Sequence, residues 1–235
     1  MGLNEKTHAY IAAKYYLYLK EKYGDRGVSA FQFATKYYAE QRGRRMAQRA
    51  IADGQLLTYE TYRKYGEWVN TEDVKALGQA NASEVVSVTP DYEIHVHTCP
   101  WHAQFKEMGL PEGGVAYCSD LDASIARGFN PYIRYATVQT LHDHDFCIQR
   151  VEDAGLTDGA RPERKKDGLK SFNYHCAHSY WSYRETIIGI FKEDGREIAD
   201  KVFSDLEADY GAEAAKIIKA YENTNFNVNT EEITF

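Results

Sequence analysis

The apolar residues of this chain repeat with two different periods, and each period occupies its own stretch of sequence. Over residues 5–80 they recur every three to four positions, which is the spacing of one helix face. From about Ser83 they alternate with polar residues, as in half-buried strands, and after Ser171 the helical spacing returns. Because long runs of one element type are segregated in this way, the sequence predicts an α+β fold with a small antiparallel sheet.

The N-terminal stretch predicts three helices. Gly24 to Gly27 interrupt the first, and Ser29 is a suitable N-cap for a second helix that ends at about Ala52, before Asp53-Gly54. Thr58–Val69 predicts a short third helix.

The central stretch predicts four strands, with Pro90-Asp91 forming a hairpin between the first two; the strands are expected at residues 85–88, 92–98, 132–141 and 146–151. Helices are expected at 100–108 and 115–126, with Pro111, Gly113 and Gly114 as a break between them. Residues 171–221 should be helical with a break at Gly211, and the tail 224–235 could add an edge strand. We therefore expect a single domain over 1–235, with a helical part (1–80), a catalytic core (83–191) and C-terminal helices with a tail (192–235).

Composition narrows the class of protein. The net charge of −7 argues against a protein whose main role is to bind duplex nucleic acid. No stretch approaches the roughly 20 apolar residues of a membrane span, and the first residues lack the pattern of a signal peptide. The expectation is a cytoplasmic protein with a small-molecule partner, four cysteines that are thiols or ligands, and an oligomeric state left open.

Seven of the eight histidines and all four cysteines lie between His95 and His178. On a strand, His95 and His97 point to one face, and Cys99 continues that face if the strand reaches it. Such a trio could ligate zinc or iron. The alternative is that these residues lie on a polar, solvent-facing side of the sheet. We expect no cofactor, with zinc or iron as the alternative.

Two further groups carry the residue types of catalysis. Cys118 would lie at a helix N-terminus if a helix begins near Ser119, and the helix dipole would then favour the thiolate. His175 and His178 lie one turn apart on a predicted helix and could act as acid or base, or remain satisfied core histidines. We predict Cys118 as nucleophile, His175 or His178 as acid/base and Asp122 as the residue that orients the base.

Other polar residues have mainly structural interpretations. Residues 142–145 (His-Asp-His-Asp) predict a turn, with metal binding as the alternative. Arg42, Arg45 and Arg49 share a helix face that we expect to be solvated, although the face could instead bind a substrate carboxylate. Asn130 could contact substrate or cap its turn. Cys147 and Cys176 are expected to be buried.

An ordered set of residues resembles the L-2-amino-thiazoline-4-carboxylic acid hydrolase family. Its elements are Thr98-Cys99-Pro100, Gly109, Tyr117-Cys118, Asp122, Gly128-Phe129-Asn130-Pro131, Thr140-Leu141, Asp145-Phe146-Cys147 and His175-Cys176-Ala177-His178. The resemblance spans about residues 85–190, with a departure at His144, where a glycine is expected.

The resemblance implies hydrolytic opening of a five-membered cyclic amidine that bears a carboxylate, giving a carbamoyl-cysteine. We therefore expect a hydrolase that opens a small cyclic amidine or amide, with Cys99, Tyr117 and Asn130 as substrate contacts. A weaker resemblance, to the four-vinyl-reductase type of small-molecule-binding domain, implies the alternative of a ligand or metal sensor without catalysis.

Overall fold

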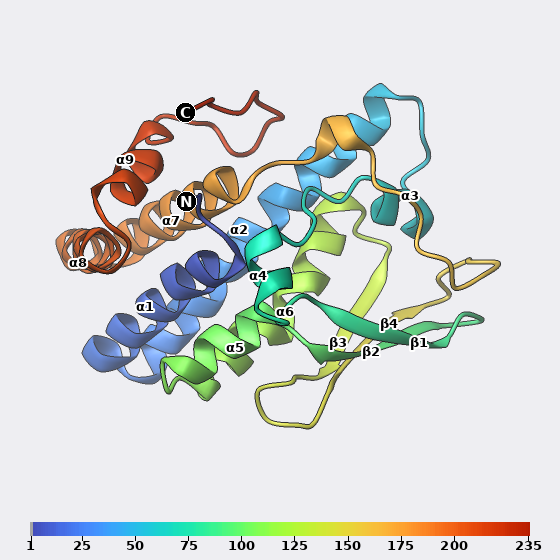
Figure 1. The fold of residues 1–235 in the computed structure, drawn as a ribbon, viewed down its shortest axis with the longest axis horizontal. Coiled ribbons are helices and arrows are strands. Elements are labelled where there is room, and N and C mark those ends of the chain that lie inside the picture. The colour runs from blue at the N-terminus through green and yellow to red at the C-terminus, as the bar shows by residue number, and fades with distance from the viewer. Residues whose placement is uncertain (1) are drawn as a thin grey trace.

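The computed structural model describes residues 2–235, in which helices precede, interrupt and follow one small sheet (Figure 1). The N-terminal helices are α1 (Glu5–Tyr23), α2 (Asp25–Ala52), α3 (Tyr59–Lys64) and α4 (Glu72–Ala76). The central part contains β1 (Ala82–Ser87), β2 (Tyr92–Thr98), α5 (Pro100–Glu107), α6 (Pro111–Phe129), β3 (Arg134–Gln139) and β4 (Cys147–Glu152). A 3₁₀ turn (Lys166–Gly168) precedes α7 (Phe172–Phe191), α8 (Glu193–Tyr210) and α9 (Ala212–Ala220). The α+β prediction is confirmed.

The sheet has the strand order β1-β2-β4-β3, and every neighbouring pair is antiparallel. All four predicted strands are present, and the hairpin between β1 and β2 is confirmed. Alternate residues of β2, namely Tyr92, Ile94 and Val96, face the interior and line a cavity. The sheet therefore presents one wall to the helices and one face to the outside.

Helix α2 begins earlier than expected, so the prediction of Ser29 as its N-cap is wrong. Gly24 has a φ of +55° and reverses the chain within one residue, so α1 and α2 follow each other without a loop. A Cβ atom on Gly27 would lie 1.9 Å from the Leu19 carbonyl oxygen. The glycines that resembled a loop thus permit a tight helical hairpin.

Helix α6 also begins earlier than expected, because Pro111 occupies the first turn, where a missing N–H is tolerated. Gly113 and Gly114 lie inside the helix and do not break it. A Cβ atom at Gly113 would lie 2.6 Å from the ring of Tyr16. These glycines allow close packing of the helix against its neighbours.

The C-terminal helical stretch breaks at Gly211, as predicted, and also at Lys192, which has a φ of +56°. The tail contains no strand within residues 224–235, so that prediction is wrong. Phe226 is instead buried, and its carbonyl oxygen accepts a hydrogen bond of 2.6 Å from Arg45. The tail is therefore held at Phe226 by a hydrogen bond from the buried Arg45 side chain, and not by pairing with a strand of the sheet. The third helix is also shorter than predicted.

The main core is rich in tyrosine, which supplies apolar area and a polar tip. Tyr15 and Tyr183 stack with ring centroids 5.1 Å apart, and Tyr15 donates a hydrogen bond to the carbonyl of Tyr180. Helix α6 packs against both α2 and β3, which places it between the helical layer and the sheet (Figure 1). No helix within residues 2–235 combines the length and the apolar character needed to cross a membrane.

Candidate active site

A cavity of about 280 Å³ lies between the inner face of the sheet and the helices α2 and α6. Its walls combine aromatic and aliphatic side chains with a small set of thiol, imidazole, carboxylate and guanidinium groups. This volume and composition are typical of a pocket for a small polar molecule.

Cys118 and His142 form the shortest nucleophile–base contact in this cavity, with Sγ 3.3 Å from Nε2. Burial raises the pKa of the Cys118 thiol well above its usual value. Burial, together with the neighbouring His102, lowers the pKa of His142 to about 4. At neutral pH the pair therefore consists of a thiol and a neutral imidazole, which can accept the thiol proton.

The position of His142 depends on the turn after β3 and on Gly114. Thr140 Oγ1 accepts from the backbone N–H of His142 and donates to Asp143 Oδ1. This arrangement confirms the predicted turn. The imidazole lies against α6 at Gly114, where a Cβ atom would be 2.1 Å from Nδ1.

Cys118 lies in the interior of α6, so its predicted place at a helix N-terminus is wrong. The helix begins seven residues earlier, at Pro111. The helix dipole acts within the first turn and therefore has little effect on this thiol. Burial raises the pKa instead of lowering it, and the neutral imidazole of His142 is the neighbouring group that can accept the thiol proton.

Asp122 lies one turn after Cys118 on the same face of α6 and lines the cavity. Its Oδ2 accepts 2.8 Å from Nε2 of Gln149, whose Oε1 accepts from the Tyr135 hydroxyl. The structure thus orients Asp122 through Gln149 and does not bond it to a histidine. Burial raises the pKa of Asp122, and Arg42 and Gln149 act in the opposite direction.

Arg42 and Arg164 place two guanidinium groups at the cavity, and neither makes a hydrogen bond to any residue in the described range 2–235. Both contact Trp68, with Cζ atoms 5.9 Å and 5.4 Å from the ring centroid. Arg42 Nε is buried without a hydrogen-bond partner and lies 4.0 Å from the carboxylate of Glu67. Burial, with Arg42 nearby, lowers the pKa of Arg164 to about 10. Guanidinium groups that are largely shielded from water and make no hydrogen bond favour an anionic ligand.

The prediction of a solvated arginine face on α2 is therefore wrong. The side chains of Arg42, Arg45 and Arg49 are only 11%, 0% and 11% exposed. Arg42 reaches the cavity and lies 4.0 Å from the carboxylate of Glu67, whereas Arg45 and Arg49 make hydrogen bonds to that buried carboxylate. One arginine of the three therefore remains available for a ligand.

Further lining residues complete the polar wall. Cys99 is the N-cap residue of α5 and lines the cavity with Tyr117 and Cys147. His102 lies beside His142, with ring centroids 5.2 Å apart. All four cysteines are free thiols, and burial raises the pKa of Cys99 and of Cys147.

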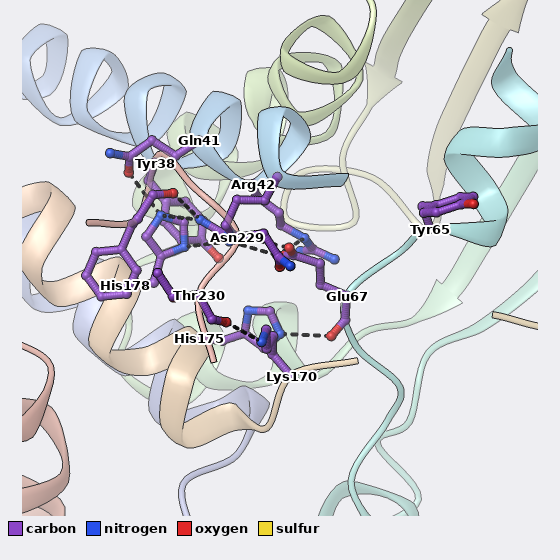
Figure 2. A network of polar contacts seen from close by, with 12 residues as sticks. Tyr38, Gln41, Arg42, Tyr65, Glu67, Lys170, His175, His178, Asn229 and Thr230 are labelled. Atoms are coloured by element: carbon purple, nitrogen blue, oxygen red, sulfur yellow. Dashed lines mark hydrogen bonds and ion pairs between the residues drawn. The ribbon is translucent and has the colours of Figure 1, made fainter. Parts of the chain in front are cut away.

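His175 and His178 belong to a buried polar network (Figure 2), and neither histidine lines the cavity. His178 Nε2 donates to Gln41 Oε1 at 2.9 Å, and its Nδ1 accepts from Arg45 at 3.3 Å. His175 Nε2 donates to the carbonyl of Glu67 at 3.2 Å. The structure does not bring either histidine to Cys118. Their shared helix face, which suggested catalysis, is a core face.

Asn130 lies outside the cavity, at the end of α6. Its Nδ2 donates to the carbonyl of Leu57 at 2.8 Å, and its Oδ1 accepts from the N–H of Tyr132 at 2.9 Å. Both polar atoms of the side-chain amide therefore make hydrogen bonds to backbone groups, and Asn130 caps the turn.

His95, His97 and Cys99 do not converge. His95 stacks on Phe146 with centroids 4.5 Å apart, and His97 contacts Glu84 at 3.1 Å on the outer face of the sheet. Strand β2 ends at Thr98, so Cys99 leaves that face and turns to the cavity. Across residues 2–235, no three or more His, Cys, Asp or Glu side chains are grouped to hold a metal ion.

Sequence reasoning did not single out His102 or Arg164, and it placed His142 in a turn, with metal binding as the alternative, and not beside Cys118. One sequence signal bears on His142: Gly114 lies inside α6, where a glycine lowers helix stability and therefore indicates close packing. Arg164 belongs to a charged loop whose composition indicates only a solvated segment.

The sequence profile of the L-2-amino-thiazoline-4-carboxylic acid hydrolase family matches residues 4–148. The matched part includes the N-terminal helices, Cys118 and His142, and it ends before α7, which corrects the span of about 85–190 expected from the motifs. No curated protein and no solved structure matches the chain significantly. Because the profile covers more than half of the 235 residues, the chain belongs to the L-2-amino-thiazoline-4-carboxylic acid hydrolase family.

Proposed function

We propose that this protein hydrolyses a small cyclic amidine that bears a carboxylate, such as L-2-amino-thiazoline-4-carboxylic acid, with Cys118 as nucleophile and His142 as general base and acid. The observation that carries the proposal is the 3.3 Å contact between Cys118 Sγ and His142 Nε2 at the cavity. Family membership supports the reaction class.

Substrate recognition follows from the charges that face the cavity. The guanidinium groups of Arg42 and Arg164, which make no hydrogen bond within residues 2–235, suit the substrate carboxylate. Asp122 has one oxygen bonded by Gln149, and its other oxygen makes no hydrogen bond within the described residues, so it can accept from the amidine N–H groups. A ligand with one negative and one positive group would therefore neutralise both the guanidinium groups and the Asp122 carboxylate.

The first step forms a bond between the Cys118 sulfur and the amidine carbon, while the thiol proton passes to Nε2 of His142. The imidazole then gives this proton to the ring nitrogen, whose bond to the same carbon breaks. Because Cys118 and His142 both start neutral, the proton transfer accompanies attack and requires no preformed thiolate.

The second step is hydrolysis of the enzyme-bound intermediate. A water molecule gives one proton to His142 and adds its oxygen to the same carbon. The Cys118 sulfur leaves and takes that proton back. The second proton of the water passes to the released amino group, the water oxygen becomes the carbamoyl oxygen, and the exocyclic nitrogen is retained. Because the ring C–N bond breaks and the carbon stays on the substrate sulfur, the product is S-carbamoyl-cysteine.

The test is to incubate the purified protein with L-2-amino-thiazoline-4-carboxylic acid and to follow carbamoyl-cysteine by mass spectrometry. Cys118→Ala and His142→Ala should each lower kcat by at least about a hundredfold. A Cys118→Ala variant that retains wild-type turnover would exclude the nucleophile. Wild-type protein that releases no product would exclude this substrate.

Two variants serve as matched controls. His144→Ala removes an exposed imidazole from the same turn, and Cys176→Ser removes a core thiol whose Sγ lies 3.8 Å from the carbonyl of Asn4, an acceptor that serine can also use. Both should keep wild-type kcat. We propose a reaction without a cofactor, so turnover should also survive treatment with EDTA; loss of turnover that zinc or iron restores would contradict this.

A further inference from the structure

Three hydrogen-bonded side chains from three helices reach the helical end of the cavity. Trp101 Nε1 donates to Nδ1 of His8 at 3.0 Å, and Nε2 of His8 lies 2.9 Å from the Tyr38 hydroxyl. The exposed fractions of Trp101, His8 and Tyr38 are 9%, 1% and 2%, and all three line the cavity. The chemistry proposed for Cys118 and His142 uses none of them.

The chemistry of indole determines the protonation of His8. An indole nitrogen can only donate, so Nδ1 of His8 must be the acceptor and carries no proton. Burial lowers the pKa of His8 well below its usual value, so the ring is neutral. Its single proton is therefore on Nε2, and His8 donates to Tyr38.

This direction leaves the proton of the Tyr38 hydroxyl available. The hydroxyl oxygen accepts from His8, and it has no second hydrogen-bond partner among residues 2–235. Burial raises the pKa of Tyr38 to about 12, so the group remains a phenol and a donor. After burial, the guanidinium of Arg42 exerts the strongest influence on the pKa of this phenol.

Tyr38 and Arg42 are four residues apart on α2, so they lie one turn apart on the same helix face. Both line the cavity, and the buried Nε of Arg42 has no hydrogen-bond partner among the described residues. A neutral O–H donor beside a cationic donor is an arrangement suited to two oxygens of one carboxylate.

We propose that Trp101 and His8 fix the direction of the Tyr38 hydroxyl so that it donates to the substrate carboxylate alongside Arg42. Tyr38 is then a substrate-binding residue, and Trp101 and His8 are positioning residues that act through it. The carboxylate as acceptor rests on the proposed function, whereas the direction of the hydroxyl follows from the geometry around His8.

The direction can be measured without any substrate. In protein with ¹⁵N-labelled histidine, the His8 signals are assigned by their loss in His8→Gln. The expected wild-type spectrum shows a protonated Nε2 and an unprotonated Nδ1. In Trp101→Phe the indole donor is absent, and the proton of His8 should shift at least partly to Nδ1.

Turnover of L-2-amino-thiazoline-4-carboxylic acid tests the contact. Tyr38→Phe should raise KM by about tenfold with a smaller change in kcat, because one hydrogen bond to a charged group is lost. Trp101→Phe should raise KM in the same direction, and the double variant should be little worse than Tyr38→Phe alone. Tyr37→Phe is the control, since that hydroxyl lies on the outside of α2 and contacts Glu185.

The outcomes separate this inference from the proposed function. A wild-type His8 spectrum with the proton on Nδ1 would overturn it, and so would wild-type KM in a folded Tyr38→Phe variant. If the wild-type protein does not turn over the substrate, the proposed function fails. The His8 spectrum then decides alone whether the Tyr38 hydroxyl is directed to the cavity.

Discussion

Gly114 and His142 occupy adjoining space, because a Cβ atom on Gly114 would lie 2.1 Å from Nδ1 of the imidazole. The absence of a side chain at one position of α6 therefore allows the imidazole to reach the thiol, which lies one turn further along the same helix at Cys118. A helix interior normally favours alanine over glycine by about 0.5–1 kcal/mol. At position 114 the imidazole of His142 occupies the space that an alanine methyl group would need, so the site favours glycine there.

Gly114→Ala should therefore fold but lose activity. The added methyl group displaces the imidazole of His142, which can rotate away about its side-chain bonds. This movement separates Nε2 from Cys118 Sγ. We expect kcat/KM to fall about as far as in His142→Ala, by roughly a hundredfold. The control is Gly189→Ala in α7, where nothing lies within 4 Å of the new Cβ; urea unfolding should show equal or higher stability with unchanged activity. Wild-type activity in Gly114→Ala would argue against His142 as the base.

The pH profile should report the depressed pKa of His142. Only the neutral imidazole can accept the Cys118 proton, and burial keeps it neutral down to a pKa of about 4. We therefore expect kcat/KM to stay level as pH falls from 8 to 5 and to decline only near pH 4. Circular dichroism at each pH separates this limb from unfolding. A decline centred near pH 6.5 would indicate an exposed or different histidine.

Removal of one guanidinium should weaken substrate binding more than chemistry. Arg164→Gln should raise KM by about 10- to 100-fold, the value of a charge-assisted hydrogen bond of roughly 1.5–3 kcal/mol. The carboxamide analogue of the substrate should show a similar loss with wild-type protein and little further loss with the variant. Arg196→Gln is the control, because Arg196 lies on α8 and pairs with the exposed Glu193. Equal effects on both compounds would exclude a carboxylate contact.

Glu67 should control stability in acid. Burial alone would raise its pKa, but Arg45 and Arg49 outweigh burial and lower the pKa to about 2. Because the folded pKa lies below the unfolded value, this stabilisation is present above about pH 4.5 and is lost as pH falls towards 2. Urea unfolding between pH 2 and 6 should reveal a loss on the order of 3 kcal/mol.

The variant Glu67→Gln separates this effect from the other carboxylates. It leaves the buried charge of Arg45 without its partner, so stability near pH 7 should fall by about 3–5 kcal/mol. Its stability should also vary less between pH 2 and 4.5 than that of the wild type. Glu60→Gln, which removes an exposed partner of Lys64, should change stability by less than about 1 kcal/mol.

Much of the fold follows from local pattern. The alternation at Tyr92, Ile94 and Val96 predicted a strand with one buried side, and the structure places those residues on the inner face of the sheet. Two of the errors concern glycine. Gly24 and Gly114 allow a sharp reversal or a close contact within helical structure, and the sequence alone does not distinguish these uses from a loop.

The residues of the candidate site could be predicted from the sequence only in part. Cys118 was identified from a helix N-terminus that the structure places seven residues earlier, and Asp122 was identified because it lies one turn after Cys118, which is a local relationship. His142 and Arg164 reach the same cavity from a turn and a loop distant in sequence, and no local period links them to α6. His175 and His178 have the residue types of catalysis, but the helix on which they lie directs them into the core.

The sequence by itself determined the α+β order of elements, the strand faces and the family, because these depend on residues near one another along the chain. Only the tertiary structure decided which imidazole contacts Cys118 and which arginines reach the cavity without making a hydrogen bond. Those relationships depend on packing between distant segments. The pKa values of the Cys118–His142 pair follow from the same packing, since burial shifts both.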